Sequence, residues 1–211
     1  MLDSVDVEVA RRLEAGDELE EVYTWFTDEP GMAERLQQRG FVQWQEPGGS
    51  VLIADLAAVP ELVAPSGYEL GWVADDDDVH ERVESHRTAF APSDLTEPMY
   101  RRVRCTWPNR PELDRIVKSA EGEVAACCLA WFDESNRAGL LEPVSTHPAH
   151  QNRGLGRLVV ADALQALRAA GATVAQIGTS GPAARAAYTA AGFRPWNHET
   201  TFRKPLRSGE R

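Results

Sequence analysis

The chain of 211 residues has no long apolar run, few cysteines and a shortage of positive charge. No apolar segment is long enough to span a bilayer, and the acidic N-terminus has no apolar signal core, so we expect a cytoplasmic protein. Its 22 Lys and Arg against 33 Asp and Glu give a formal net charge of −11. This charge argues against non-specific binding to nucleic acid or to an anionic membrane.

The three cysteines, Cys105, Cys127 and Cys128, are too few for a disulfide framework. The adjacent pair lies in an apolar run, which favours buried and inert thiols. No His, Cys, Asp and Glu residues occur at the spacing of a metal site, so we expect no metal.

A hydrophobic fraction of 43% is enough for a proper core. After residue 66 the order of elements is strand, two helices, three strands, and then alternating helices and strands. Strands are expected at residues 68–73, 113–119, 124–132 and 139–146, and helices at 75–89 and 94–103. An Asp75 cap and a capping box of Asp94 with Glu97 would begin the two helices. This order predicts an α/β (α+β) layered fold.

The first 65 residues are expected to form helices at 18–26 and 32–39, and strands at 41–45 and 50–56 around a turn at 46–49. Gly40, Phe41 and Trp44 match Gly192, Phe193 and Trp196 with one offset of 152 residues. The match suggests a degenerate repeat. A plain N-terminal extension explains the segment nearly as well. Proline and glycine at residues 60–67 place the domain boundary between 1–65 and 66–211.

Residues 140–156, LLEPVSTHPAHQNRGLG, are the most informative stretch. They predict a strand, a turn and a glycine-containing loop that leads directly into a helix. The unpaired N–H groups at a helix start, together with Arg153 and Arg157, favour a bound phosphate or diphosphate. The spacing fits neither the Gly-x-Gly-x-x-Gly dinucleotide motif nor a P-loop.

The string Gln151–Gly156 matches Gln/Arg-x-x-Gly-x-Gly/Ala, the acyl-CoA signature of the GNAT superfamily of acyl-CoA-dependent N-acyltransferases. The preceding strand ends at Pro148, and a later helix carries Tyr188 followed by Gly192 and Phe193. The chain resembles this family over about residues 67–206. The resemblance implies a mixed central sheet that is splayed at its fourth strand, with helices on both faces, and acetyl-CoA as the co-substrate.

The resemblance also implies which residues hold the co-substrate. Family members often carry Asn where this chain has Gly181, so Thr179 or Ser180 is expected to replace that contact. The expected acetyl-CoA-binding residues are Val144, Ser145, Thr146, Gln151, Asn152, Arg153, Gly154, Leu155, Gly156, Arg157, Thr179 and Ala184.

Two residues are candidates for catalysis. Glu142 lies just before Pro143 on the central strand, and its carboxylate would act as a base, with a raised pKa if it is buried. It fits a purely structural role at a bulge equally well. By resemblance, Tyr188 would donate a proton or a hydrogen bond to the departing thiolate. No cysteine lies where an acyl-enzyme would need it, which favours direct transfer in a ternary complex.

The predicted function is therefore N-acetyl transfer to a primary amine, most simply that of a small molecule. Two alternatives remain open: a catalytically silent acyl-CoA-binding module, and an interaction protein that forms a homodimer through its N-terminal segment. His147 and His150 are expected to be exposed in a surface turn. The acceptor pocket could be lined by His86, Arg87, Phe90, Trp107 and Trp131, although aromatic residues at such sites are more often core.

Overall fold

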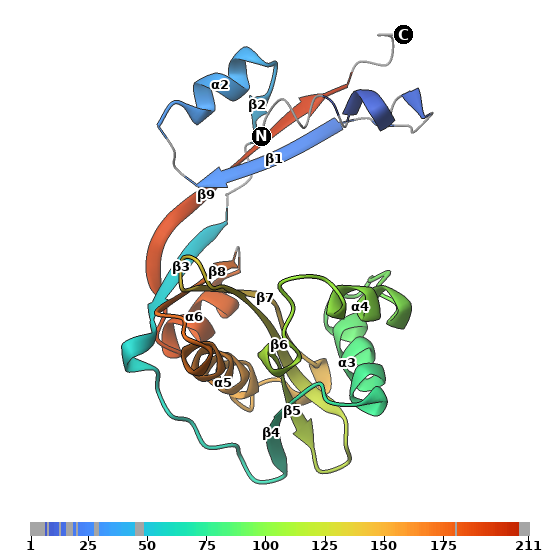
Figure 1. The fold of residues 1–211 in the computed structure, drawn as a ribbon, viewed down its shortest axis with the longest axis vertical. Helices are drawn as coiled ribbons and strands as arrows, with labels where there is room; N and C mark the ends of the chain where they lie inside the picture. The colour runs from blue at the N-terminus through green and yellow to red at the C-terminus, as the bar shows by residue number, and fades with distance from the viewer. Residues whose placement is uncertain are drawn as a thin grey trace. The chain divides into compact units, whose positions relative to one another are not determined.

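The computed structural model describes residues 7, 9–12, 14, 15, 19, 21–27, 30–44, 49–179 and 181–206 (Figure 1). The chain divides into two compact units. The first unit contains Met1–Gly49 and Asn197–Arg211, and the second contains Ser50–Trp196. The boundary expected near residue 65 thus falls within the second unit.

The second unit is built on a sheet with the strand order β3-β8-β7-β6-β5-β4 (Figure 1). The pair β7 and β8 is parallel, whereas the other neighbouring pairs are antiparallel. The predicted mixed sheet is confirmed. The strand bounds are β3 Ser50–Asp55, β4 Tyr68–Trp72, β5 Asp114–Ser119, β6 Val124–Asp133, β7 Ala138–Thr146 and β8 Val174–Thr179.

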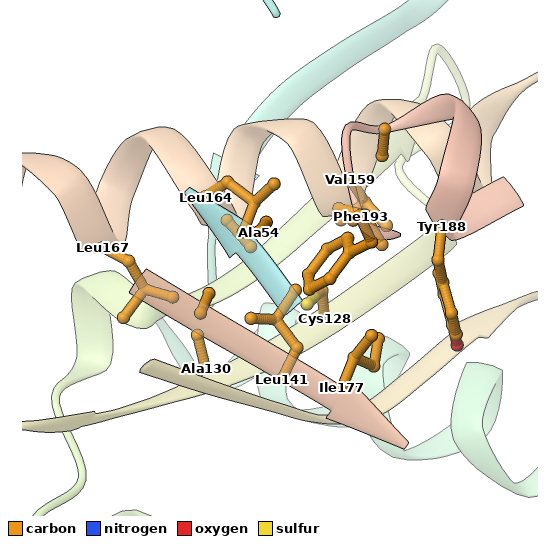
Figure 2. Close-up of a cluster of buried hydrophobic side chains, with 14 of the residues drawn as sticks. Ala54, Cys128, Ala130, Leu141, Val159, Leu164, Leu167, Ile177, Tyr188 and Phe193 are labelled. Atoms are coloured by element: carbon orange, nitrogen blue, oxygen red, sulfur yellow. The ribbon is translucent and has the colours of Figure 1, made fainter. Parts of the chain in front are cut away.

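Helices cover both faces of this sheet. Helices α5 (Leu155–Ala170) and α6 (Pro182–Ala190) pack on one face, in an apolar cluster that includes Cys128 of β6 (Figure 2). Helices α3 (Asp76–Ala89) and α4 (Glu97–Arg104) pack on the other face, in a cluster that includes Cys127. Successive side chains of a strand point to opposite faces, so the two adjacent cysteines belong to different cores. Short 3-10 turns η1 (Leu56–Ala58), η2 (Pro111–Leu113) and η3 (Pro148–His150) complete the unit.

The helix starts follow local sequence, with one correction. The backbone N–H of Asp78 donates to Asp75 Oδ1 at 2.9 Å, so Asp75 caps α3 as predicted. Helix α4 is capped by Thr96, whose Oγ1 accepts from the N–H of Met99 at 3.4 Å, and not by Asp94. Thr96 immediately precedes Glu97 and Pro98, and proline suits the first turn of a helix because its missing N–H would have no partner there.

Strand β7 separates from β8 midway along its length. The two strands pair only at residues 138–140 of β7 with 174–176 of β8. On its other side, β7 has a bulge, because Glu142 and Pro143 together lie opposite Leu129 of β6. The bulge lies at Pro143, since proline cannot donate the hydrogen bond that a regular ladder needs, and the splay begins just before it.

The first unit has its own small sheet. Strands β1 (Glu21–Thr27) and β2 (Val42–Gln43) both pair antiparallel with β9 (Arg194–Pro205). Leu36 of helix α2 (Met32–Gln38) packs there with Phe41 and Phe202.

The helix expected at residues 18–26 was wrong, because residues 21–27 form β1. Val22, Tyr23 and Thr24 favour a strand, and the antiparallel pairing with β9 decides the outcome. The expected turn at 46–49 lies largely outside the described residues, and β2 ends before it.

Two strands lie in a different unit from the one expected from sequence. Strand β3 precedes the first strand of the predicted domain, yet it pairs with β8 inside the second unit. Strand β9 follows α6, yet its C-terminal part pairs with β1 and β2 in the first unit. The first unit therefore depends on both ends of the chain, whereas the second is continuous from Ser50 to Trp196.

A buried polar cluster joins α3 and α4 to β5. Arg82 and Asp114 are each 1% exposed, and Arg82 Nε lies 3.4 Å from Asp114 Oδ1. Tyr100 donates its hydroxyl to Asp114 Oδ2, and the Arg82 guanidinium lies 5.5 Å from the Tyr100 ring centre. Burial and the neighbouring Asp114 raise the pKa of Tyr100 far above its usual range. The charges of Arg82 and Asp114 stabilise each other, because water does not reach this buried cluster to solvate either one alone.

We predict that Arg82→Met lowers the free energy of unfolding by about 3–5 kcal/mol, because Asp114 would keep a buried charge without its cation. The double variant Arg82→Met/Asp114→Leu should regain part of this loss. Urea unfolding followed by circular dichroism measures both values.

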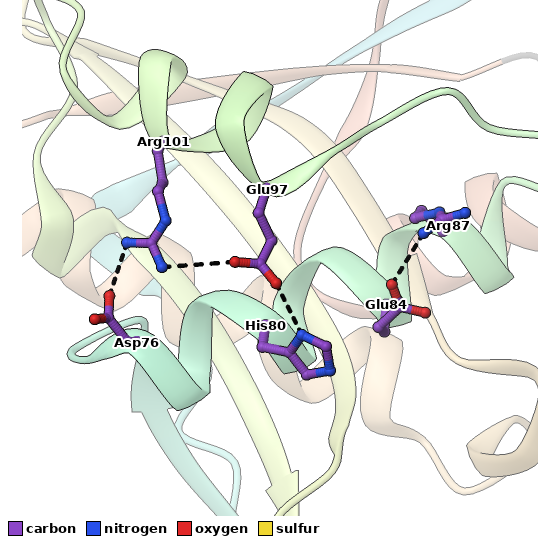
Figure 3. A network of polar contacts seen from close by, with 6 residues as sticks. All are labelled: Asp76, His80, Glu84, Arg87, Glu97 and Arg101. Atoms are coloured by element: carbon purple, nitrogen blue, oxygen red, sulfur yellow. Dashed lines mark hydrogen bonds and ion pairs between the residues drawn. The ribbon is translucent and has the colours of Figure 1, made fainter.

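The matched control is Arg101→Met, since Arg101 bridges Asp76 and Glu97 at the surface, where Glu97 also contacts His80 (Figure 3). Solvent screens such pairs, so little change is expected from this variant. Equal losses in Arg82→Met and Arg101→Met would contradict the prediction.

Candidate functional site

A cavity of about 570 Å³ opens where β7 leaves β8. Four segments of the second unit form its wall: the end of α3, the end of β7, the loop that leads into α5, and α6. The lining residues are Ala89, Phe90, Val144, Ser145, Thr146, Gln151, Asn152, Gly154, Leu155, Gly156, Arg157, Ala183, Ala184, Ala187, Tyr188 and Ala190.

The N-terminus of α5 forms one wall of the cavity. Gly154, the N-cap, has a left-handed φ of 78° and makes no side-chain capping bond. The first bond of the helix runs from the N–H of Leu158 to the carbonyl of Gly154 at 3.0 Å. The N–H groups of residues 155–157 precede that bond and carry the positive end of the helix dipole. No acidic residue occupies this first turn. The wall is therefore suited to an anion.

Glycine is needed at this wall for close approach. A Cβ atom added to Gly156 would lie 3.0 Å from Thr146 Oγ1, so the helix start approaches the end of β7 closely. A Cβ added to Gly154 would meet nothing within 4 Å, although its left-handed φ disfavours most side chains. The space above Gly154 is open for a ligand.

The backbone of β7 forms the second wall. The N–H of His147 donates to Ala125 at 2.9 Å, so odd-numbered residues at this end of β7 face β6. Antiparallel ladders alternate, and the amides of Val144 and Thr146 therefore point away from β6. On that side β8 has already separated from β7. These amides face the splay.

Tyr188 on α6 lies at the edge of the apolar cluster and lines the cavity (Figure 2). Its ring contacts Phe193, with the ring centres 6.2 Å apart, and it is 8% exposed. Burial, followed by the nearby Cys128, raises the pKa of Tyr188 to about 12. The phenol is consequently protonated at neutral pH and can donate a hydrogen bond.

Glu142 is exposed and does not line the cavity. The sequence left open whether this carboxylate is buried, and it lies at the surface. Its backbone carbonyl accepts a hydrogen bond from Trp131 Nε1 at 3.1 Å, which holds the bulge from the neighbouring strand.

The predicted co-substrate residues lie around this one cavity, except Arg153 and Thr179. Arg153 Nη1 donates to the Tyr68 hydroxyl at 2.8 Å instead. Thr179 Oγ1 accepts from the N–H of Gly181 at 3.3 Å. Ser180 lies outside the described residues.

Other sequence predictions need correction. His150 is 8% exposed and not at the surface, because it packs against Tyr68 of β4. Cys127 and Cys128 are buried as expected, whereas Cys105 is exposed.

Sequence reasoning missed most of the small residues that line the cavity, namely Ala89, Ala183, Ala187 and Ala190. The three on α6 recur at spacings of four and three residues and so share one helical face, and that spacing of alanines was the available signal.

Among the described residues, no helix is long and apolar enough to cross a membrane. Within the same set, no three His, Cys, Asp or Glu side chains are placed together to hold a metal ion.

Solved structures share the fold. A GCN5-related N-acetyltransferase from Sphaerobacter thermophilus superposes with a TM-score of 0.75 at 16% identity, over 99% of this chain and 67% of that one. A GCN5-related N-acetyltransferase from Kribbella flavida gives a TM-score of 0.69 at 19% identity, over 95% and 74%. A tandem GNAT protein from the clavulanic acid biosynthesis pathway gives 0.72 at 18% identity, over 95% and 69%.

A comparison with curated protein sequences found no match. The sequence model of the GNAT acetyltransferase family matches residues 80–193, which is more than half of the chain and includes most of α3, the glycine loop and the Tyr188 helix. The chain therefore belongs to the GNAT family of acetyltransferases.

Proposed function

We propose that this protein is an N-acetyltransferase that moves an acetyl group from acetyl-CoA to a primary amine, by direct transfer in a ternary complex. The observation that carries the proposal is that one cavity joins an anion-binding helix start, the splayed β7 backbone and the Tyr188 side chain. Acyl transfer from a thioester needs these three elements: a site for the diphosphate, amides for the carbonyl oxygen and a donor for the thiolate.

The residues present fit acetyl-CoA. The N–H groups of residues 155–157 hold the diphosphate, and the open space above Gly154 admits it. Gln151, Asn152 and Arg157 add side-chain contacts around the same loop. The amides of Val144 and Thr146 pair with the pantetheine arm and stabilise the oxyanion of the thioester carbonyl.

Substitutions at Gly154 can separate the effect of a side chain's charge on binding from the effect of its shape. Asn and Asp tolerate a left-handed φ better than other non-glycine residues, and they differ here only in charge. We predict that Gly154→Asp weakens acetyl-CoA binding at least about tenfold more than Gly154→Asn does, because its carboxylate opposes the diphosphate. Calorimetric titration with acetyl-CoA measures both dissociation constants.

Equal losses in the two variants would contradict an anion site at Gly154. A wild-type chain that binds no acetyl-CoA would overturn the acyltransferase proposal and favour the interaction protein.

Tyr188 acts as a hydrogen-bond donor to the leaving thiolate. With a pKa of about 12, the phenol would lose its proton to a thiolate of ordinary pKa, about 8.5, only at a cost of about 5 kcal/mol. Full proton transfer from Tyr188 is therefore disfavoured, whereas a hydrogen bond to the developing negative charge is favourable. The proton that the thiolate finally takes comes from the attacking amine or from water.

We predict that Tyr188→Phe lowers kcat about 10²-fold and leaves the dissociation constant of acetyl-CoA nearly unchanged, since the donor acts mainly in the transition state. The matched control is Tyr100→Phe, which removes another buried hydroxyl from the same unit. The control should lower stability and retain kcat. Steady-state kinetics and titration give both values, and an unchanged kcat in Tyr188→Phe would favour a silent acyl-CoA-binding module.

Glu142 is the proposed base for the amine. A protonated amine cannot attack, so a proton must leave it, directly or through water. An exposed carboxylate beside the bulge can accept that proton through solvent, and it also attracts an ammonium ion. The alternative is that the residue only shapes the bulge, through its backbone bond to Trp131.

We predict that Glu142→Gln lowers kcat about 10²-fold, because the amide cannot accept a proton, while the dissociation constant of acetyl-CoA is retained. The loss should shrink as the pH rises and the free amine becomes more abundant. A pH profile of kcat measures this. An unchanged kcat would show that Glu142 is structural, because Gln keeps its size and polarity.

We further propose that the first unit is the residual C-terminal half of a second GNAT-like domain. The N–H of Phe41 donates to Leu36 at 3.1 Å, and that of Phe193 donates to Tyr188 at 3.0 Å, with the same offset of 152 residues. Gly40 and Gly192 both adopt a positive φ at these helix ends. The same helix ending thus occurs in both units. A Leu replaces the tyrosine, so this half would not be catalytic.

A further inference from the structure

The predicted phosphate contact Arg153 is part of a chain of side chains outside the cavity. Its Nη1 lies 2.8 Å from the Tyr68 hydroxyl, and the same hydroxyl lies 3.0 Å from His150 Nδ1. His150 Nε2 lies 3.1 Å from Glu123 Oε2. The chain connects β4, the turn between β5 and β6, and the loop before α5.

The donors and acceptors in this chain have one consistent direction. The guanidinium can only donate, so the Tyr68 oxygen accepts from Arg153. In the tautomer of His150 that carries its proton on Nε2, Tyr68 donates its own proton to Nδ1 and Nε2–H donates to Glu123. Each hydrogen bond of the series then has one donor and one acceptor. The nearby His147 takes no part, because its Nδ1 accepts from the N–H of Ala149 at 3.2 Å.

This series of hydrogen-bonded side chains is anchored in the core and ends at the surface. His150 is 8% exposed, and the Tyr68 ring packs against the main apolar cluster. The Glu123 side chain is 61% exposed, and Arg153 is also exposed. Buried groups therefore hold a long and flexible side chain in one position, which reduces the entropy that Arg153 loses on binding a ligand.

Arg153 lies beside the glycine loop without lining the cavity, whereas its neighbours Asn152 and Gly154 do line it. Coenzyme A carries a diphosphate and a separate phosphate on the ribose 3′-oxygen. Arg153 is a cation of this loop that lies outside the cavity lining. A second phosphate of the same ligand that lies outside the cavity can accept hydrogen bonds from it.

We propose that Glu123, His150 and Tyr68 are positioning residues that hold Arg153 for the 3′-phosphate of coenzyme A. The inference rests on the proposed use of acetyl-CoA. The hydrogen bond to Tyr68 uses one N–H group of Arg153, and a phosphate can accept from the others. This series of hydrogen bonds thereby makes the protein bind coenzyme A more tightly than its 3′-dephospho form.

The test is titration of the full chain with coenzyme A and with 3′-dephospho-coenzyme A. Tyr68→Phe keeps the ring, which lies under the Arg153 guanidinium and contacts His150 edge to face, and removes only the hydroxyl that connects them. We expect it to weaken coenzyme A binding about fivefold, which is the effect of one hydrogen bond, and to leave the dephospho form unchanged. Arg153→Gln should have the same selective effect.

The double variant separates positioning from a direct role. If Tyr68 acts through Arg153, Tyr68→Phe adds little to the loss already caused by Arg153→Gln. Arg157→Gln is the contrasting control, because Arg157 lines the cavity and its loss should weaken both ligands alike. Thermal unfolding of each variant shows that the fold is retained.

Losses that are additive, or that are equal for the two ligands in Tyr68→Phe, would overturn the inference and assign the chain to folding alone. Wild-type binding of both ligands with equal affinity would overturn it while the acetyltransferase proposal stands. A wild-type chain that binds neither ligand would instead overturn the proposed function.

Discussion

The site depends on one loss of pairing, where β7 leaves β8 after three residue pairs. Buried backbone N–H and C=O groups need partners, so a strand that leaves its neighbour must face solvent or a ligand. Pro143 lies at the bulge beside this point, where its missing N–H removes no useful ladder bond. The strand can therefore remain paired with β6 and present the amides of Val144 and Thr146 to a substrate. The cavity, the place of Tyr188 and the start of α5 all follow from this divergence.

An acidic protein can bind an anionic co-substrate because its charges act over short distances. Charge on the exposed surface is screened within about 8–10 Å at moderate salt, so the net charge of −11 is felt weakly inside the cavity. The N–H groups of residues 155–157 lie at the wall itself, and no acidic side chain occupies the first turn of α5. The nearby N–H groups therefore affect an anion in the cavity more strongly than the net charge of the protein does. The same reasoning explains why Arg153 must be held in place, since a mobile cation among many acids would contribute little.

The elements nearest the site could be predicted from sequence because their signals are local. The apolar spacing of α5, the glycines before it and Pro143 each act within a few residues. Features that depend on distant partners could not be predicted. Residues 21–27 become a strand because β9 pairs with them from the far end of the chain. His150 is buried because Tyr68, 82 residues earlier, packs on it. Glu142 is exposed at a bulge. The two-residue alternation of a regular strand does not predict where side chains point at a bulge.

The helix endings at Leu36–Phe41 and at Tyr188–Phe193 have the same packing arrangement but differ in the chemistry of the residue that accepts the hydrogen bond. In both units the residue after the glycine is a buried phenylalanine whose N–H returns to the helix, and the residue that accepts is buried as well. Leu36 satisfies that requirement with apolar volume alone, because its backbone carbonyl makes the hydrogen bond. Tyr188 satisfies it with a ring that also brings a hydroxyl to the cavity. Among the described residues, only those of the second unit combine this ring with the divergence of β7 and an open helix start. The proposed acetyl transfer therefore belongs to the second unit, and we propose a structural role for the first.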